Sequence, residues 1–249
     1  MDSLTQIVLG AAVGEATLGK KVGNKAMLWG AIAGTIPDLD VYFRLLTDEF
    51  TATEMHRGIT HSLIFSLALA PILAWLVTKY SKLSLGFFIT LILGYPFLTS
   101  SAIIVKVIVF IVLAILLSFV IRSKSSQSEA SFKGWTWLFF LSLVTHPILD
   151  AHTTWGTQFF WPFDIRLAFK NVFVIDPFYT LPFLIFLVLA MCQKKESKKR
   201  RSYNNVGLII STSYLLLTLV LKGISYQTFT RELTTQKIEY KEIETKPSP

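Results

Sequence analysis

Imidazole and carboxylate side chains are gathered in a few short motifs of this chain. All four histidines lie in two of them: His56 and His61 in "HRGITH", and His146 and His152 in "HPILDAH". Asp150 follows His146 by four residues, so a helix would place both side chains on one face, within reach of one cation. Imidazole nitrogen and carboxylate oxygen together suit zinc, manganese or ferrous iron. The spacing therefore predicts a divalent metal site.

Further carboxylates stand beside these motifs. The segment "TIPDLD" places Asp38 and Asp40 directly after a proline, Asp2 precedes the first apolar run, and Asp176 opens "IDPFYT". The full set of candidate metal ligands is Asp2, Asp38, His56, His61, His146, Asp150, His152 and Asp176. Because this set exceeds the needs of one ion, we expect one to three ions, and several neighbouring ions would favour phosphoester chemistry. A free carboxylate, Asp40, would serve as the general base.

The composition indicates a membrane protein. The 249 residues are 52% hydrophobic and only 16% charged, whereas a soluble domain is nearer a quarter charged. The single cysteine, Cys192, excludes a disulfide framework and a thiolate metal site. The net charge of +8 is typical of a membrane protein with basic cytoplasmic loops, so no nucleic-acid partner is inferred. No basic residue precedes the first apolar run, which argues against a cleaved signal peptide.

Long apolar runs recur along the chain and predict an all-α, polytopic transmembrane bundle of about eight segments. The expected segments are 3–19, 26–37, 62–78, 84–99, 102–121, 135–151, 177–192 and 206–222. The first two contain "GAAVG" and "GAIAG", and small residues four apart let helices approach closely, so we expect these two to pack together. Residues 1–192 would form the membrane-embedded domain that carries the site. Residues 193–249 would form a basic cytoplasmic loop, the last helix and a polar extracytoplasmic tail.

Basic residues set the expected orientation. More than half of the 24 lysines and arginines fall in a few short loops that lie on one side if every segment spans the membrane. The positive-inside rule makes that side cytoplasmic. Every histidine motif and candidate carboxylate then falls at an extracytoplasmic helix end, although the charge rule used none of them. The sequence thus predicts a single site that faces the extracytoplasmic side.

Several candidate ligands have a simpler structural explanation. Asp2 and Asp176 could cap helices, and Asp38 could be a turn or N-cap residue. His152 could lie exposed in a loop. The simpler explanation is harder to apply to the two histidine motifs taken together, because ionisable groups near lipid are costly and tend to be functional.

Two arginines lie on the same predicted side as the histidine motifs. Arg57 and Arg166 could hold an anionic group such as phosphate, Arg57 as part of the catalytic machinery and Arg166 as a substrate-binding residue. The alternative is that both are juxtamembrane residues at the lipid headgroups. Trp155 and Trp161 are typical of an interfacial aromatic belt.

Several stretches of the chain resemble the YdjM family of bacterial inner-membrane metal-dependent hydrolases. They are "MDSLTQ", "PDLD", "HRGITHS", "HPILDAHTTWGTQ", "WPF" and "IDPFYTLP", in the family's order. The resemblance implies a bacterial inner-membrane protein with a membrane-embedded metal centre. By position, the ligands that it implies are Asp38, His56 or His61, His146 and Asp150, with Asp2, Asp40 and Asp176 as further candidates.

That family is in turn distantly similar to zinc-dependent phospholipase C and to single-strand nucleases. Those enzymes use a histidine and an aspartate four residues apart on a helix, and His146 and Asp150 match this pair. The similarity implies a cluster of zinc ions held partly by the free amino terminus of the mature chain.

Two functions of different classes follow from these patterns. The first is a metal-dependent phosphoesterase that acts on a membrane lipid or a lipid-linked substrate at the outer leaflet, with no protein partner inferred. The second is a transporter or ion-handling protein that binds its ion at the same residues. Transporters often show repeated halves and ionisable groups at the bilayer midplane, and neither is evident here. An intramembrane metalloprotease would need the "HExxH" helix, which is missing. A structural or regulatory protein with a structural metal is the remaining alternative.

Overall fold

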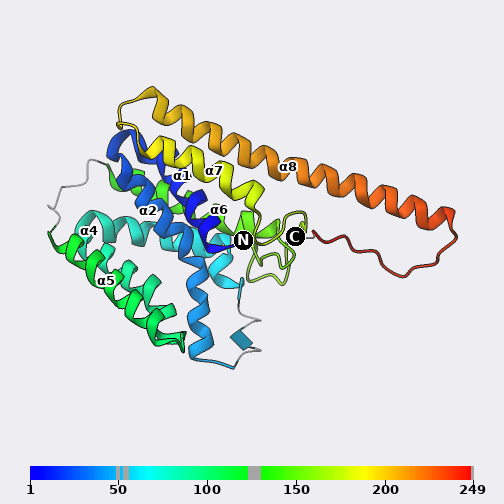
Figure 1. Ribbon diagram of the computed structural model, residues 1–249, viewed down its shortest axis with the longest axis horizontal. Coiled ribbons are helices and arrows are strands. Elements are labelled where there is room, and N and C mark those ends of the chain that lie inside the picture. The colour runs from blue at the N-terminus through cyan, green and yellow to red at the C-terminus, as the bar shows by residue number, and fades with distance from the viewer. Residues whose placement is uncertain (49–50, 53–55, 123–129, 248–249) are drawn as a thin grey trace.

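The computed structural model describes residues 1–48, 51–52, 56–122 and 130–247 (Figure 1). The helices are α1 (Ser3–Val22), α2 (Asn24–Thr35), α4 (Leu63–Thr99), α5 (Ile103–Arg122), α6 (Phe132–Ala151), α7 (Pro177–Met191) and α8 (Lys198–Thr235), with the 3₁₀ helices η1 (Pro37–Leu45) and η2 (Ile59–His61). Within the described residues, the only β-type pairing is an isolated bridge between Thr157 and Leu167. The predicted all-α helical bundle is confirmed.

Each expected segment falls within or close to one helix, and two of them share α4. This helix of 37 residues is interrupted at Tyr80, whose φ of −131° and ψ of 43° are not helical. In the described part of the chain, α4, α5 and α8 are long and apolar enough to cross a membrane, and α7 is a shorter apolar helix. This number of spans is smaller than expected. The physical reason is that α2 has only 12 residues, while α1 and α6 carry buried polar side chains.

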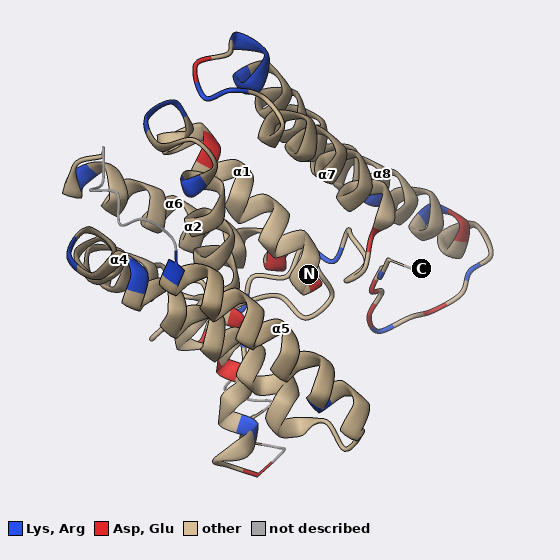
Figure 2. Ribbon diagram, turned by 60° about the vertical axis from the view of Figure 1, so that its left-hand side comes forward, with Lys and Arg blue, Asp and Glu red and all other residues tan. Residues whose placement is uncertain are grey.

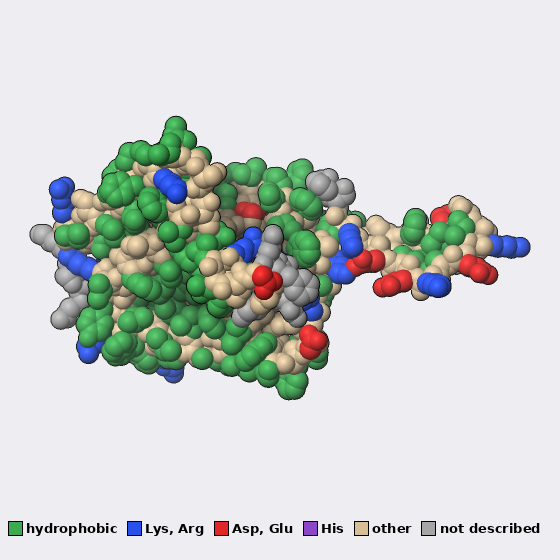
Figure 3. All heavy atoms as spheres, turned by 90° about the horizontal axis from the view of Figure 1, so that it is seen from below, with side chains coloured by type: hydrophobic (Ala, Val, Ile, Leu, Met, Phe, Trp, Pro, Cys, Tyr) green, Lys and Arg blue, Asp and Glu red, His purple; other side chains and the backbone are tan. Residues whose placement is uncertain are grey.

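Hydrophobic side chains cover much of the outside of the bundle. In α5, Val120 is the only buried residue among 20, and Phe119 is 74% exposed. Figure 3 shows a mainly hydrophobic surface on the bundle, whereas charged side chains gather on the projecting end of the chain. Apolar surface of this extent is unfavourable in water and is typical of helices in contact with lipid.

Helices α1 and α2 are in backbone contact along a row of glycines. A Cβ atom on Gly30 would lie 2.1 Å from the carbonyl oxygen of Gly10, and one on Gly14 would lie 2.2 Å from that of Ala26. Only glycine leaves room for such a close crossing, so the expected packing of these two helices is confirmed. Helix α6 packs against both, where the hydroxyl of Ser142 donates to the Gly10 carbonyl at 3.4 Å.

A buried ion pair connects the start of α8 to the C-terminal half of α1. Arg200 donates from Nε to Oε1 of Glu15 at 2.7 Å and from Nη2 to Oε2 at 2.5 Å, and both side chains are buried. Figure 2 shows Lys and Arg gathered at this end, around the α1–α2 and α7–α8 connections. Helices α1 and α2 thus run between two different ends of the bundle. The α1–α2 connection lies at the basic end, and the end of α2 lies near His146.

Candidate metal centre

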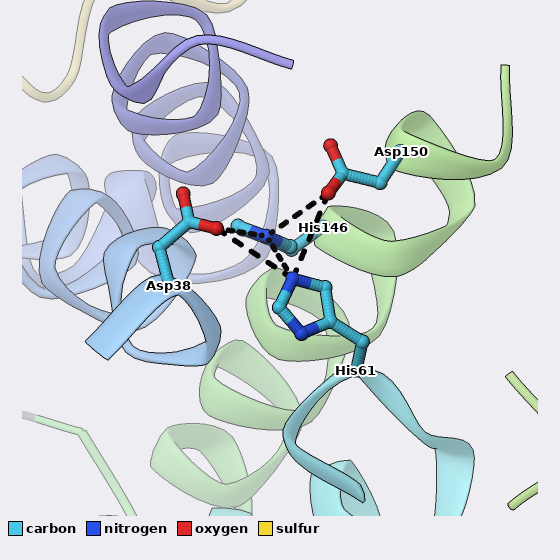
Figure 4. Close-up of side chains that lie close together, drawn as sticks. All are labelled: Asp38, His61, His146 and Asp150. Carbon is cyan, nitrogen blue, oxygen red and sulfur yellow. Dashed lines mark hydrogen bonds and ion pairs between the residues drawn. The ribbon is translucent and has the colours of Figure 1, made fainter. Parts of the chain in front are cut away.

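Asp38, His61, His146 and Asp150 point toward one another from three separate elements (Figure 4). Each offers one ligand atom, and these atoms all lie within 4.8 Å of one another. Asp38 belongs to η1 and His61 to η2, while His146 and Asp150 share one face of α6. These four residues are called the metal cluster below.

The separations within the metal cluster suit one tetrahedral ion. The Nε2 atoms of His61 and His146 lie 3.1 Å apart. Asp38 Oδ1 lies 3.6 Å and 3.4 Å from these two nitrogens, and Asp150 Oδ2 lies 3.6 Å and 3.8 Å from them. Ligand atoms at about 2.1 Å from a tetrahedral zinc ion would lie about 3.4 Å from one another.

Hydrogen bonds on the far side of each ring fix both imidazoles with Nε2 toward the cluster. Nδ1 of His146 lies 2.6 Å from the carbonyl oxygen of Gly34, which can only accept, so Nδ1 donates. The hydroxyl of Thr60 donates to Asp40 Oδ2 at 3.1 Å, which leaves its oxygen to accept from Nδ1 of His61 at 3.0 Å. In the neutral rings, two Nε2 lone pairs therefore face each other. A cation between them removes this repulsion.

Asp150 supplies a second sign that the cluster fits a cation. Its Oδ2 atom is buried and has no hydrogen-bond partner among the described residues. Arg57 Nε lies 3.3 Å away, close enough for an ion pair but without hydrogen-bond geometry. A buried carboxylate oxygen is costly to leave without a partner. An ion bound by the metal cluster would satisfy it.

The cluster is most open on the side of Asp38. The side chain of Asp38 is 20% exposed, whereas those of His61 and His146 are fully buried. Burial by itself raises the pKa of the Asp38 carboxyl, but the nearby imidazoles of His146 and His61 outweigh it and hold this pKa well below its usual range. Asp38 therefore places an ionised carboxylate on the accessible side of the cluster.

The sequence match covers the whole cluster. Residues 1–227 match the YdjM inner membrane protein family. The chain belongs to this family. The resemblance seen in the motifs is thus confirmed, and the match extends past them into α8. No curated protein and no solved structure matches the chain.

In this YdjM chain, Asp40 lies behind His61 and outside the metal cluster. Its Oδ1 atom lies 2.8 Å from His56 Nδ1, and its Oδ2 atom accepts from the backbone N–H of Arg57 at 3.1 Å. Burial raises the pKa of Asp40, but the His56 hydrogen bond, the charges of His61 and His56 and the Arg57 N–H outweigh it, so the pKa lies below its usual value. This geometry makes Asp40 an ionised group that orients the imidazoles around it.

Arg57 occupies a strained position between the two histidines of its motif. Its φ of 63° lies in the left-handed region, which is uncommon for a residue with a side chain. Its guanidinium Nη1 donates to the hydroxyl of Thr153 at 2.9 Å, and its carbonyl accepts from the N–H of Gln158 at 3.0 Å. These contacts hold a positive charge beside Asp150, at the edge of the metal cluster.

Two of the candidate ligands act as helix caps. Asp2 accepts from the backbone N–H and the hydroxyl of Thr5 at the start of α1. Asp176 accepts from two backbone N–H groups at the start of α7 and from the hydroxyl of Tyr214 on α8 at 2.9 Å. Neither aspartate belongs to the metal cluster. Their assignment as ligands stays a prediction.

His152 and Arg166 also lie outside the metal cluster. Nδ1 of His152 lies 3.0 Å from the side-chain oxygen of Asn171, just after the end of α6. Arg166 is exposed and donates to the carbonyl oxygen of Trp155 at 3.2 Å. The roles of His152 as a ligand and of Arg166 in substrate binding stay predictions.

The structure adds two groups that the sequence did not assign to the site. Gln6 donates from Nε2 to Asp150 Oδ1 at 2.8 Å, and Gly34 supplies the carbonyl oxygen that orients His146. A polar glutamine within the first apolar run was a sequence signal for Gln6. The Gly34 carbonyl is a backbone group at the end of α2, and residue type gives no signal for it.

Proposed function

We propose that this YdjM-family chain is a membrane-bound metal-dependent hydrolase whose ion is held by Asp38, His61, His146 and Asp150. The observation that carries the proposal is the pair of Nε2 atoms at 3.1 Å, each on a ring whose Nδ1 is already engaged. Zinc suits a tetrahedral set of two nitrogens and two carboxylate oxygens, and manganese is the alternative. A set without thiolates favours a hydrolytic over a structural site.

The reaction that fits these residues is phosphoester hydrolysis. A divalent ion would supply Lewis acidity and would lower the pKa of a bound water. The guanidinium of Arg57 would hold an anionic phosphate oxygen beside the cluster. Asp40 would hold His61 and His56 in place rather than act as the general base, because both of its oxygens accept hydrogen bonds in a buried position.

The proton acceptor that remains is His56. Its side chain is 28% exposed, and its Nδ1 faces Asp40 Oδ1, so in the neutral ring Nε2 is the atom that can take a proton. A histidine that is oriented by a buried carboxylate is a common arrangement for a general base. We therefore assign proton transfer to His56 and its orientation to Asp40.

The substrate class that we propose is a membrane lipid or a lipid-linked phosphoester. Two observations support it: the outside of the bundle is mainly hydrophobic, and the loop after α6 exposes Trp155 and Phe163. Aromatic side chains of this kind are typical of headgroup depth in a bilayer. The basic α1–α2 connection precedes the start of α2, whereas Asp38 and the Gly34 carbonyl that contacts His146 lie at the end of α2. By the positive-inside rule, this arrangement supports an extracytoplasmic site.

The test begins with metal content. Protein purified in detergent without chelator should contain about one zinc or manganese ion per tetrahedral site, and His146→Ala should lose it. Ser142→Ala is the matched control, because Ser142 lies one turn earlier on the same buried face of α6 and should retain the ion. A wild-type protein without stoichiometric metal would refute the proposal.

Hydrolysis is tested separately on phospholipid vesicles. Wild-type protein reconstituted with its metal should release phosphorylated headgroup, and His56→Ala and Arg57→Ala should each lower the rate while metal content stays at the wild-type level. Metal-loaded protein that hydrolyses no phospholipid or lipid-linked phosphoester, but carries divalent ions across liposomes, would replace the hydrolase with the transport alternative.

A further inference from the structure

The two oxygens of Asp150 lie in different surroundings. Oδ2 faces the metal cluster and has no hydrogen-bond partner among the described residues. Oδ1 faces α1, where it accepts from Gln6 Nε2 at 2.8 Å and contacts the amino group of Met1. Because a carboxylate bonded through one oxygen keeps the other oriented, the contacts from α1 decide which oxygen an ion would meet.

We propose that Gln6 is a positioning residue that fixes Asp150 as a one-oxygen ligand of the metal cluster. This inference rests on the metal site proposed above. The carboxylate can only accept, so the amide nitrogen of Gln6 must be the end that faces it. The same nitrogen lies 3.4 Å from the carbonyl oxygen of His146. The amide group of Gln6 thus contacts the turn of α6 that carries both His146 and Asp150.

The other end of Gln6 shows that packing alone does not explain this residue. Gln6 is 1% exposed, and its Oε1 atom is buried without a hydrogen-bond partner in the described part of the chain. A buried carbonyl oxygen without a donor lowers the stability of a fold. A methionine would fill nearly the same volume without this cost, so the amide is better explained by what its nitrogen does for Asp150.

The crossing of α1 and α2 brings Gln6 to this position. A Cβ atom on Gly34 would lie 2.7 Å from the backbone oxygen of Gln6, so the two helices are in contact at this turn. Gly34 also supplies the carbonyl oxygen that orients His146. The contact of these two backbones therefore places an orienting group beside each of the two α6 residues: the Gln6 amide beside Asp150 and the Gly34 carbonyl beside His146.

The experiment compares Gln6→Met and Gln6→Glu with wild type, with Ser142→Ala as the control. Zinc affinity is measured by competition with a chromophoric chelator, cobalt coordination by visible absorption, and metal-free stability by thermal unfolding. Gln6→Met should bind zinc about 10-fold more weakly, as is usual for loss of a group that orients a ligand, with an altered cobalt spectrum. Metal-free stability should stay near wild type, because removal of the unpartnered Oε1 atom offsets the lost hydrogen bond and Oδ1 of Asp150 keeps its contact with the Met1 amino group. Gln6→Glu should lose more affinity, because its carboxylate would repel Asp150.

Three results would overturn the inference. Wild-type zinc affinity and an unchanged cobalt spectrum in Gln6→Met would show that Asp150 needs no help from Gln6. A loss of affinity that comes with a matching loss of metal-free stability would reduce Gln6 to a structural role. Absence of zinc binding in wild type would overturn the metal site itself, which separates that failure from a failure confined to Gln6.

Discussion

His146 donates from Nδ1 to the carbonyl oxygen of Gly34 at 2.6 Å. The end of α2 therefore orients the imidazole ring of His146, one member of the metal cluster. Gly34 can lie there because α1 and α2 cross through glycines. The packing of these two helices and the geometry of the site are therefore coupled. A substitution that separates α1 from α2 should displace the Gly34 carbonyl and so alter the orientation of His146 in the metal cluster.

Gly30→Ala should destabilise the fold and weaken metal binding together. The added Cβ would lie 2.1 Å from the Gly10 carbonyl oxygen, and forced overpacking of this kind costs about 1–3 kcal/mol. Thermal unfolding and zinc titration measure the two effects. The control is Gly223→Ala on α8, where a Cβ would meet nothing within 4 Å and should add up to about 1 kcal/mol of helix stability. Equal metal affinity in Gly30→Ala and wild type would contradict the coupling.

Removal of the metal should lower thermal stability. An ion at 100 times its dissociation constant stabilises a folded protein by about 2.7 kcal/mol, so chelator should lower the unfolding temperature and added zinc should restore it. His61→Ala, which lacks one of the two facing nitrogens, should show no response to chelator. Scanning calorimetry with and without chelator measures this. A chelator response that persists in His61→Ala would place the ion elsewhere.

Asp176→Ala should weaken α7 without loss of metal. Its carboxylate caps the helix and accepts from Tyr214, and loss of a cap costs about 1 kcal/mol. Asp150→Ala should instead abolish metal binding. Elemental analysis and thermal unfolding of the two variants separate a cap from a ligand. Metal loss in Asp176→Ala would instead support the sequence-based prediction that this residue is a ligand.

Replacement of Arg200 should destabilise the attachment of α8. Arg200→Met leaves Glu15 buried without its partner, and loss of one member of a buried pair costs about 3–5 kcal/mol. The double variant Glu15→Leu with Arg200→Met should recover much of this loss, because no charge is left unpaired. Unfolding of wild type, Arg200→Met, Glu15→Leu and the double variant gives the coupling free energy. Additive losses in the double variant would contradict a direct interaction.

The exposed cysteine at the end of α7 can test the orientation. Cys192 is the single cysteine of the chain, and it lies next to the basic segment that starts α8. A membrane-impermeant maleimide should label it in inside-out vesicles and not in intact cells. In the variant Cys192→Ser with Phe163→Cys, labelling should occur from the opposite side. The same sidedness for both cysteines would contradict the extracytoplasmic placement of the site.

Hydrophobic patterning predicted the helices because each one needs a continuous apolar run, whatever its neighbours are. The same patterning overestimated the spans: the 26–37 run became the 12-residue α2, which is too short to cross a bilayer alone. The 62–78 and 84–99 runs form the two helical parts of α4, which meet at a kink at Tyr80. Helix length depends on packing and local geometry, which periodicity does not report.

The residue types of the metal cluster were predictable because imidazole and carboxylate groups are uncommon in an apolar chain and all four histidines fall in two short motifs. Which aspartates join His61 and His146 was not, because Asp2 and Asp176 carry the same group at helix starts. The contacts that orient the cluster residues could not be predicted from the sequence either. The Gln6–Asp150 bond joins residues 144 positions apart, and only the fold brings them together.

The metal cluster draws its ligands from segments that are far apart along the chain: His61 and His146 are separated by 85 residues. A growing polypeptide contains η1 and η2 long before it contains α6. The four side chains can therefore converge only after α6 has been synthesised and has docked on α1 and α2. The proposed metal site would form as a late event in the biogenesis of the protein, and a chain stalled before α6 would lack two of its four proposed ligands.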